Sequence, residues 1–222
     1  MTYCIAFLGS KGGVTKSTLA RAVAVAYTAA EWETIVADLE LGQATSRKWA
    51  MRREEADLKP SIYVKSFGSV SALEIEIKKG DKDIFIIDSP AFATKSSIDI
   101  ALISNLVVLP TGYSEDDMNS TAEMANSLVL EGIDSDKICI VFSGVDEQKT
   151  QSAREKDYAE AITYFSALPY KIIDGYIPRT PALRKALDSG RSITECIYPG
   201  PRAKADHVVQ GIITRLEQLT GE

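Results

Sequence analysis

Short apolar runs alternate with longer segments of mixed character along the whole chain. The short runs are rich in β-branched and aromatic residues, which favour strands. Strands are expected over residues 3–8, 34–37, 61–64, 84–87, 106–109, 138–142 and 171–173. The longer segments carry apolar residues at helical spacing. Helices are expected over residues 17–30, 45–56, 70–78, 115–130, 152–168, 181–189 and 203–219.

Such alternation is typical of βαβ units around a parallel sheet. It continues without an internal repeat, a low-complexity tract or a Pro/Ser-rich linker. We therefore expect residues 1–222 to form one α/β domain, whose mostly parallel, twisted sheet of about seven strands is covered by helices on both faces. The last helix has an apolar stripe that we expect to close the core. Its members are Val208, Val209, Ile212, Ile213, Leu216 and Leu219.

The composition is that of a soluble globular protein, with 45% hydrophobic and 25% charged residues. No apolar run is long enough for a transmembrane helix, and no basic region precedes the first run as in a signal peptide. We therefore expect a cytoplasmic protein. The three cysteines form no Cys-x-x-Cys pair and are expected to be buried, and catalysis by the only histidine, His207, is not expected. A net charge of −6 argues against a surface covered with nucleic-acid-binding charge, but leaves room for a local basic patch.

The loop over residues 9–18, between the first strand and the first helix, has the clearest chemistry. Glycines at Gly12 and Gly13 let a chain curl around phosphate groups, which need unblocked backbone amides. The helix that begins near Ser17 adds free amides and the positive end of its dipole. In this arrangement Lys16 reaches the β- and γ-phosphates of a nucleotide, and the Ser17 hydroxyl binds Mg²⁺.

This loop departs from the common pattern G-x-x-x-x-G-K-[ST], because Ser10 and Thr15 stand where it has glycines. It matches the variant x-K-G-G-x-x-K-[ST], and so resembles the ParA/MinD family of deviant Walker A ATPases. The resemblance implies a P-loop NTPase fold with ATP and Mg²⁺ as cofactors. It also implies a homodimer formed on ATP binding, in which Lys11 contacts the nucleotide of the opposite subunit. The implied cofactor-binding residues of the loop are Gly12, Gly13, Val14, Thr15, Lys16, Ser17 and Thr18.

Two acidic motifs extend the resemblance. Asp38 and Glu40 follow the second strand with the spacing of the family's D-x-D, whose second acid orients the attacking water. Glutamate is one methylene longer, and a displacement of about 1 Å can cost about a hundredfold in rate, so we expect slow hydrolysis. Asp88 ends a strand that resembles Walker B and is expected at Mg²⁺, and residues 89–96 are the expected switch that senses the γ-phosphate. The expected catalytic residues are thus Lys11, Lys16, Asp38 and Glu40.

Base recognition is expected at the end of the last strand. In the family the loop after that strand packs on adenine, and the resemblance gives this role to backbone groups near Pro178. After the sixth strand the chain reads Ser143-Gly144-Val145-Asp146, where guanine binders carry Asn-Lys-x-Asp. Because the Asn and the Lys are missing, we expect ATP and not GTP.

Relatives act either on DNA or on membranes, and two charge patterns favour DNA. Residues 178–202 carry five basic side chains against two acidic ones and form the expected contact with non-specific DNA. The basic ones are Arg179, Arg184, Lys185, Arg191 and Arg202. A lesser candidate is the cluster of Arg47, Lys48, Arg52 and Arg53 around Trp49. Residues 203–222 carry two basic and three acidic side chains and make a poor anchor on anionic lipid, so no stable membrane association is expected.

Residues 111–136 carry seven acidic side chains and no lysine or arginine. Ser114 can cap the helix that follows, and acids in its first turn favour the positive end of the helix dipole. The other acids suit a basic partner peptide, such as the ParB-type centromere-binding activator that relatives use. With the loop beginning at Gly9, we expect no amino-terminal helix-turn-helix domain, and the chain most resembles the small ParA-type partition ATPases.

The expected function is therefore that of a ParA-type Mg-ATPase in plasmid or chromosome partition, cytoplasmic and associated with the nucleoid. Its ATP-bound dimer is expected to bind DNA without sequence preference and to be reset by partner-stimulated hydrolysis. Two alternatives stay open. One is a MinD-like membrane-associated positioning ATPase, and the other is a nucleotide-gated adaptor that does not hydrolyse ATP.

Overall fold

The computed structural model describes residues 2–11, 13, 15–40, 42, 44–90, 95–147 and 150–221. Its strands are β1 (Tyr3–Phe7), β2 (Thr34–Asp38), β3 (Val64–Ser66), β4 (Ile84–Asp88), β5 (Leu106–Thr111), β6 (Ile138–Asp146) and β7 (Lys171–Arg179). Its α-helices are α1 (Lys16–Ala29), α2 (Thr45–Glu55), α3 (Val70–Ile77), α4 (Lys95–Leu102), α5 (Glu115–Leu130), α6 (Gln151–Ser166), α7 (Pro181–Asp188) and α8 (Pro199–Thr220). Two short 3₁₀ turns, Ser135–Lys137 and Ile193–Glu195, complete the described elements.

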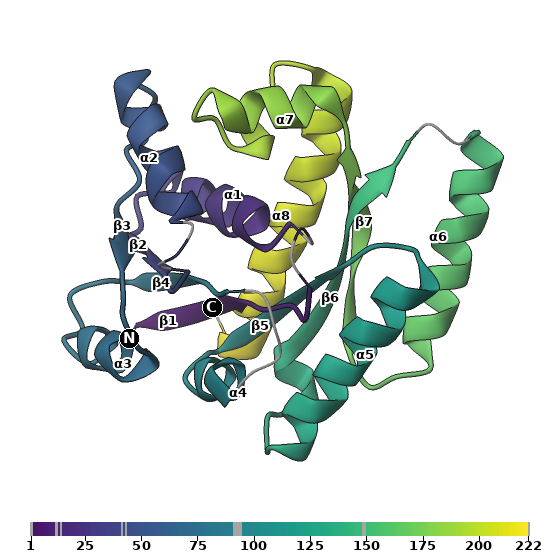
Figure 1. Cartoon of the computed structure of the whole chain (residues 1–222), viewed down its shortest axis with the longest axis horizontal. Coiled ribbons are helices and arrows are strands. Elements are labelled where there is room, and N and C mark those ends of the chain that lie inside the picture. The colour runs from purple at the N-terminus through teal and green to yellow at the C-terminus, as the bar shows by residue number, and fades with distance from the viewer. Residues whose placement is uncertain are drawn as a thin grey trace.

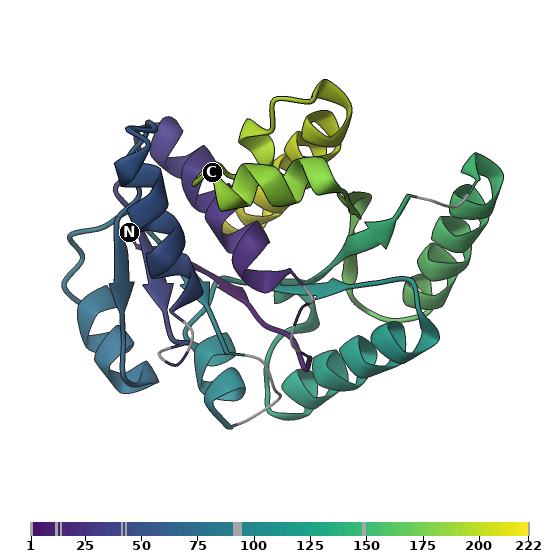
Figure 2. The same cartoon turned by 45° about the horizontal axis from the view of Figure 1, so that its top comes forward.

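The seven strands form one sheet in the order β3-β2-β4-β1-β5-β6-β7, and every neighbouring pair is parallel. The predicted α/β class and parallel sheet are confirmed. Helices α1, α2, α7 and α8 cover one face, while α3, α4, α5 and α6 lie on the other (Figures 1 and 2). Strands β1, β2, β4 and β5 are buried at every residue, which explains why they read as short apolar runs.

Three predicted elements differ from the structure. The third strand is Val64–Ser66 and not 61–64. Ile62 is buried in the same apolar cluster as Trp49 of α2, so its apolar character reflects packing against the helix and not pairing with β2. Helix α4 was not predicted, since it is short and follows residues 91–94, which lie outside the described part of the chain. Helix α8 begins at Pro199 and not at 203, because prolines are tolerated in a first turn whose amides have no helical partner.

The carboxy-terminal helix belongs to the core. Val208, Val209, Ile212 and Leu216 of α8 are buried against β7 and α1 in the same apolar cluster, which confirms the predicted role of the stripe. All three cysteines are free and buried, as predicted. Within the described residues no helix is both long and apolar enough to span a bilayer.

The central strands bring the acidic motifs together. In the sheet register Asp88, at the end of β4, lies beside Asp38 at the end of β2 and beside Phe7 at the end of β1. The loop that follows β1 leads directly into α1. Three segments distant in sequence therefore meet at the carboxyl edge of the sheet, where ligands of open α/β sheets bind.

Candidate nucleotide-binding site

The loop between β1 and α1 has an unusual backbone. Gly13 has φ 81° and Thr15 has φ 65°, both in the left-handed region. Thr15 is the residue before the first turn of α1, and its carbonyl accepts the first helical hydrogen bond from Leu19. Gly12 and Val14, also expected to bind the cofactor, lie outside the described residues. The described part of the loop thus leads into the amino-terminal end of a helix, which favours anions.

Lys16 is held inside this loop. Only 7% of the residue is exposed, and its Nζ donates to the carbonyl oxygen of Lys11 at 3.1 Å. Burial lowers the pKa of the Lys16 ammonium, while the negative charges of Asp88 and Glu40 oppose that shift. The loop therefore holds a buried cation, which suits phosphate, near two carboxylates, which suit a metal ion bound with that phosphate.

Asp88 is fully buried and holds a network of polar side chains. Its Oδ1 accepts from the Ser17 hydroxyl at 3.0 Å, and its Oδ2 accepts from the Ser46 hydroxyl at 2.6 Å. Arg21 Nε in turn donates to Ser46 Oγ at 3.1 Å. Burial raises the pKa of Asp88 to about 6, although the hydrogen bonds from both serines and the Arg21 charge act in the opposite direction.

Asp38 is the second buried carboxylate of this edge. Its Oδ1 accepts from the Glu40 backbone amide at 2.9 Å, which fixes the turn that carries Glu40. Its Oδ2 is buried and has no hydrogen-bond partner among the described residues. Burial raises the pKa of Asp38, and the nearby backbone amides of Glu40 and Arg47 oppose this shift.

These side chains fit a magnesium ion. The Ser17 hydroxyl, the Asp88 carboxylate and the orphaned Asp38 oxygen are hard oxygen donors, which Mg²⁺ prefers. Mg²⁺ also keeps several waters and takes ligands from substrate phosphates, so a complete cage of protein carboxylates is not needed. Ser17 and Asp88 are the pair that the sequence predicted for the metal, and the structure brings them into direct contact.

A cavity of about 650 Å³ extends from the loop toward the end of β7. Gly13, Thr15 and Thr18 line it on the loop side, and Pro178 lines it on the other. The sequence placed Pro178 in a loop after the last strand, but it lies within β7, which continues to Arg179. Its position beside the cavity is still the one that the adenine-binding prediction requires.

The five basic residues expected at DNA have different surroundings. Arg179 and Arg184 line the same cavity as the loop. Arg191 is half-buried and donates to Ser189 Oγ at 3.3 Å, whereas Arg202 is exposed and lies 3.5 Å from Asp206. Lys185 is exposed on α7. Two of the five thus lie at the nucleotide cavity, and the other three lie outside its lining.

The lesser basic cluster on α2 is partly structural. Arg53 is 1% exposed, and its guanidinium binds both oxygens of Glu195 at 2.7 and 2.9 Å. Trp49 is buried between Arg21 and Arg53 and donates to the carbonyl of Arg191 at 3.0 Å. These two residues are therefore unavailable to DNA, which corrects the prediction for Arg53.

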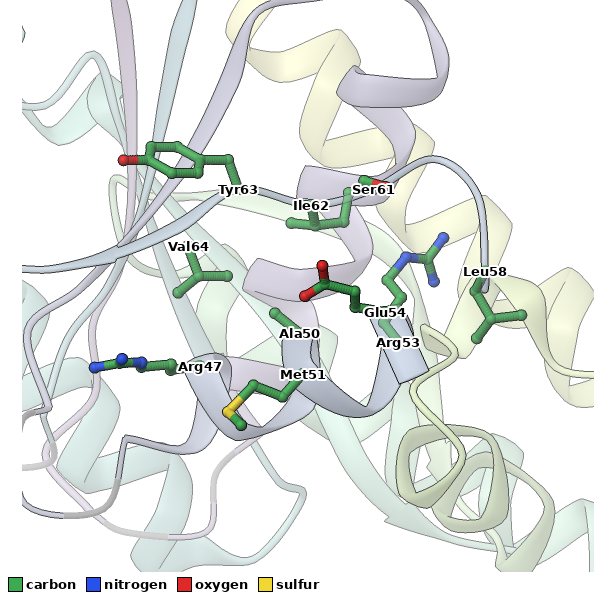
Figure 3. A pocket seen from close by; sticks show the side chains of 10 residues that line it. All are labelled: Arg47, Ala50, Met51, Arg53, Glu54, Leu58, Ser61, Ile62, Tyr63 and Val64. Atoms are coloured by element: carbon green, nitrogen blue, oxygen red, sulfur yellow. The ribbon is translucent and has the colours of Figure 1, made fainter. Parts of the chain in front are cut away.

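Helix α2 also borders a second cavity, of about 390 Å³, at the β3 edge of the sheet. Figure 3 shows Met51 and Arg47 on the helix and Tyr63 on the segment opposite. Met51 and Tyr63 are more than half exposed. None of the residues expected to bind a nucleotide lines this cavity, so it is separate from the site described above.

Lys11 contacts its own chain in this structure. Its Nζ donates to the Asp116 carbonyl at 2.8 Å and lies 3.4 Å from Asp117 Oδ1, at the start of α5. Ser114 caps that helix by accepting from the Asp117 amide at 3.2 Å, as predicted. One part of the acidic segment thus has a basic partner within the molecule.

Sequence reasoning missed Arg21, Ser46 and Ser143. Arg21 lies one helical turn after Ser17, so i, i+4 spacing on α1 was a usable signal. Ser46 reaches Asp88 across 42 residues, and Ser143 accepts from the Thr15 hydroxyl across 128 residues. No local sequence pattern predicts contacts between residues so far apart in the chain.

A phosphate-binding loop between β1 and α1, with carboxylates at the ends of two adjacent parallel strands, defines a P-loop nucleotide-binding protein. Residues 5–193 match the model of the CobQ/CobB/MinD/ParA nucleotide binding domain, and the chain belongs to this family. No curated protein matches the chain in sequence.

Solved structures of this family share the fold. A MinC:MinD cell division protein complex from Aquifex aeolicus has a TM-score of 0.70 at 17% identity, covering 100% of this chain and 96% of that one. An ATP complex of McdA from Cyanothece has a TM-score of 0.67 at 18% identity, covering 99% and 96%. MinD complexed with Mg-ADP from Pyrococcus horikoshii has a TM-score of 0.68 at 16% identity, covering 100% and 98%.

Proposed function

We propose that this chain is a Mg²⁺-dependent ATPase of the ParA type, which dimerises on ATP binding and serves in plasmid or chromosome partition. The observation that carries the proposal is the meeting of Lys16, Ser17 and Asp88 at one edge of the sheet, next to a cavity of nucleotide size. The ATP complex of McdA and the Mg-ADP complex of MinD support these cofactors.

The adenine end of the proposed site is the part of the cavity beside Pro178. This residue has no backbone N–H, so it can offer only its carbonyl oxygen to the base, and backbone amides of its neighbours would supply the donors. The residues after Phe142 lack the Asn and Lys of guanine binders, which favours ATP.

Glu40 is the proposed residue that orients the attacking water. Its backbone is fixed by the hydrogen bond to Asp38, and its charge acts on Lys16 inside the loop. Mg²⁺ bound with the nucleotide would neutralise charge on the β- and γ-phosphates. With glutamate in place of the family's aspartate we expect slow turnover, accelerated by a ParB-type centromere-binding activator.

Lys11 is the proposed residue that joins two subunits. A second cation supplied by the opposite subunit would stabilise the charge of the bound triphosphate. In the dimer, basic residues after β7 would hold non-specific DNA through its phosphates. This reaction cycle would place the protein in the cytoplasm, on the nucleoid.

Two observations bear on the alternatives. The stripe of α8 is buried in the core, so it is not free to lie on a membrane as a MinD-like positioning ATPase would require. Glu40 departs from the family's D-x-D and Thr15 from the common G-x-x-x-x-G-K-[ST] loop, and both departures favour an adaptor that binds ATP without hydrolysing it.

The test compares ATP with ADP in three assays on the purified protein and its Lys16→Ala variant: nucleotide binding, phosphate release and gel shift of random-sequence DNA. We expect ATP-dependent DNA binding and slow phosphate release in the wild type only. Binding without any turnover, even with DNA and the cognate partner, supports the adaptor. Recruitment to anionic liposomes with ATP supports the membrane alternative.

A further inference from the structure

Thr15 occupies a backbone position that ordinarily needs glycine. Its φ of 65° and ψ of 15° lie in the left-handed region, which is unfavourable for a β-branched residue. Such strain persists only where the surroundings enforce it. The side chain does not cap the amides of α1, so another contact must hold this conformation.

That contact is a hydrogen bond to β6, which lies two strands away from β1 in the sheet. The Thr15 hydroxyl donates to Ser143 Oγ at 2.5 Å. Ser143 is 5% exposed and lies in β6, next to a bulge at which Gly144 takes a φ of 73°. The bond therefore ties the phosphate-binding loop to the carboxyl end of β6.

The pair lies beside the cavity that would receive the nucleotide. Thr15, Gly144 and Arg179 all line that cavity. A Cβ built on Gly144 would lie 3.8 Å from Thr15 Cγ2 and 3.6 Å from Arg179 Nη2. The methyl group of Thr15 thus faces Gly144, and its hydroxyl is directed to Ser143, between the phosphate end and the base end of the site.

We propose that Thr15 and Ser143 form a positioning pair. The hydrogen bond between their hydroxyls holds the nucleotide-binding loop in its binding conformation before the nucleotide arrives, whereas a glycine at position 15 would leave the loop flexible. The inference rests on the proposed ATP site. A glycine at position 15 would sample many conformations and would lose that freedom when the nucleotide binds. The Thr15–Ser143 bond fixes the conformation in advance, so removing either hydroxyl weakens nucleotide binding.

The experiment measures the Kd of a fluorescent ATP analogue by titration, well below the melting temperature of each variant. Thr15→Val keeps the β-branched shape and removes the hydroxyl, and Ser143→Ala removes the acceptor. Each should raise Kd by about 3- to 10-fold, as for loss of one neutral hydrogen bond. The Thr15→Val/Ser143→Ala double variant should bind no worse than either single variant, and Thr15→Ser should restore wild-type Kd.

Thr15→Gly relieves the strain but restores flexibility, and adding Ser143→Ala to it should change nothing. An unchanged Kd in both single variants overturns the inference, as do losses that multiply in the double variant. A loss explained by unfolding alone would appear in the melting temperature and would not be rescued selectively by Thr15→Ser. Wild-type protein that binds ATP no better than Lys16→Ala overturns the proposed function together with this pair.

Discussion

Lys11 Nζ lies 3.4 Å from Asp117 Oδ1 of the same chain. The proposed dimer needs this ammonium group on the opposite subunit's nucleotide, so its contact with α5 must break first. Both side chains are more than a third exposed, and exposed ion pairs contribute about 0.2–1 kcal/mol. The contact is therefore weak enough to be exchanged.

Asp117→Asn should promote dimerisation with ATP. Loss of the ion pair weakens the hold of α5 on Lys11, which keeps its hydrogen bond to the Asp116 carbonyl. We expect each subunit's lost ion pair to lower the protein concentration at half-dimerisation by about 1.5- to 5-fold. Sedimentation with a non-hydrolysable ATP analogue measures this. Glu123→Gln, at an exposed acid on the same helix, is the matched control. Equal dimerisation of Asp117→Asn and wild type would show that the contact does not compete.

Lys11→Ala should separate nucleotide binding from dimerisation. Lys16 and Ser17 remain in place, so the monomer should still bind ATP. The dimer should be lost, because the cation that bridges the subunits is gone. An unchanged sedimentation profile with ATP would refute the role of Lys11.

Glu195→Gln should destabilise the fold. Burial raises the pKa of Glu195, but hydrogen bonds from Arg53 and from the Ser192 amide prevail and hold it below the usual 4.5. Breaking a buried ion pair costs on the order of 3–5 kcal/mol, discounted here because the Glu195 side chain is 25% exposed. Urea unfolding measures the loss, and the exposed Glu55→Gln on α2 should cost little.

The same pair predicts a pH dependence. A carboxyl whose pKa is lowered on folding stabilises the protein above its unfolded pKa, near 4.5, and loses that contribution as pH falls through the folded value. Wild-type stability should therefore fall more steeply below pH 4.5 than that of Glu195→Gln. Parallel pH profiles of the two proteins would contradict the ion-pair assignment.

Lys185→Glu combined with Arg202→Glu should weaken DNA binding while ATP affinity is unchanged. Neither residue lines the nucleotide cavity, whereas Arg184 does and would confound the measurement. We expect a smaller salt dependence, with the slope reduced by about one for each DNA phosphate that the variant no longer binds. Lys156→Glu, an exposed lysine on α6, is the control. If binding and slope stay the same, DNA contacts another surface.

Local sequence patterns determined much of this site. Each part of the site lies at the end of a helix or strand that the sequence predicts: the loop follows β1, Ser17 lies in the first turn of α1 and Asp88 ends β4. Their positions along the chain were therefore enough to predict that Ser17 and Asp88 meet. Most strands could also be predicted locally, because a strand that is buried on both faces consists of consecutive apolar residues. The short third strand was misplaced, since an apolar residue buried under a helix looks the same in sequence.

Tertiary structure alone decided the contacts between distant segments. Lys11 meets Asp117 across 106 residues, Thr15 meets Ser143 across 128, and Arg53 meets Glu195 across 142. Each depends on how the sheet orders its strands and where the helices pack, which a single sequence does not encode in any local spacing. Sequence therefore determined the chemistry of the loop and the strand ends, and packing decided which charges are paired, buried or free to act.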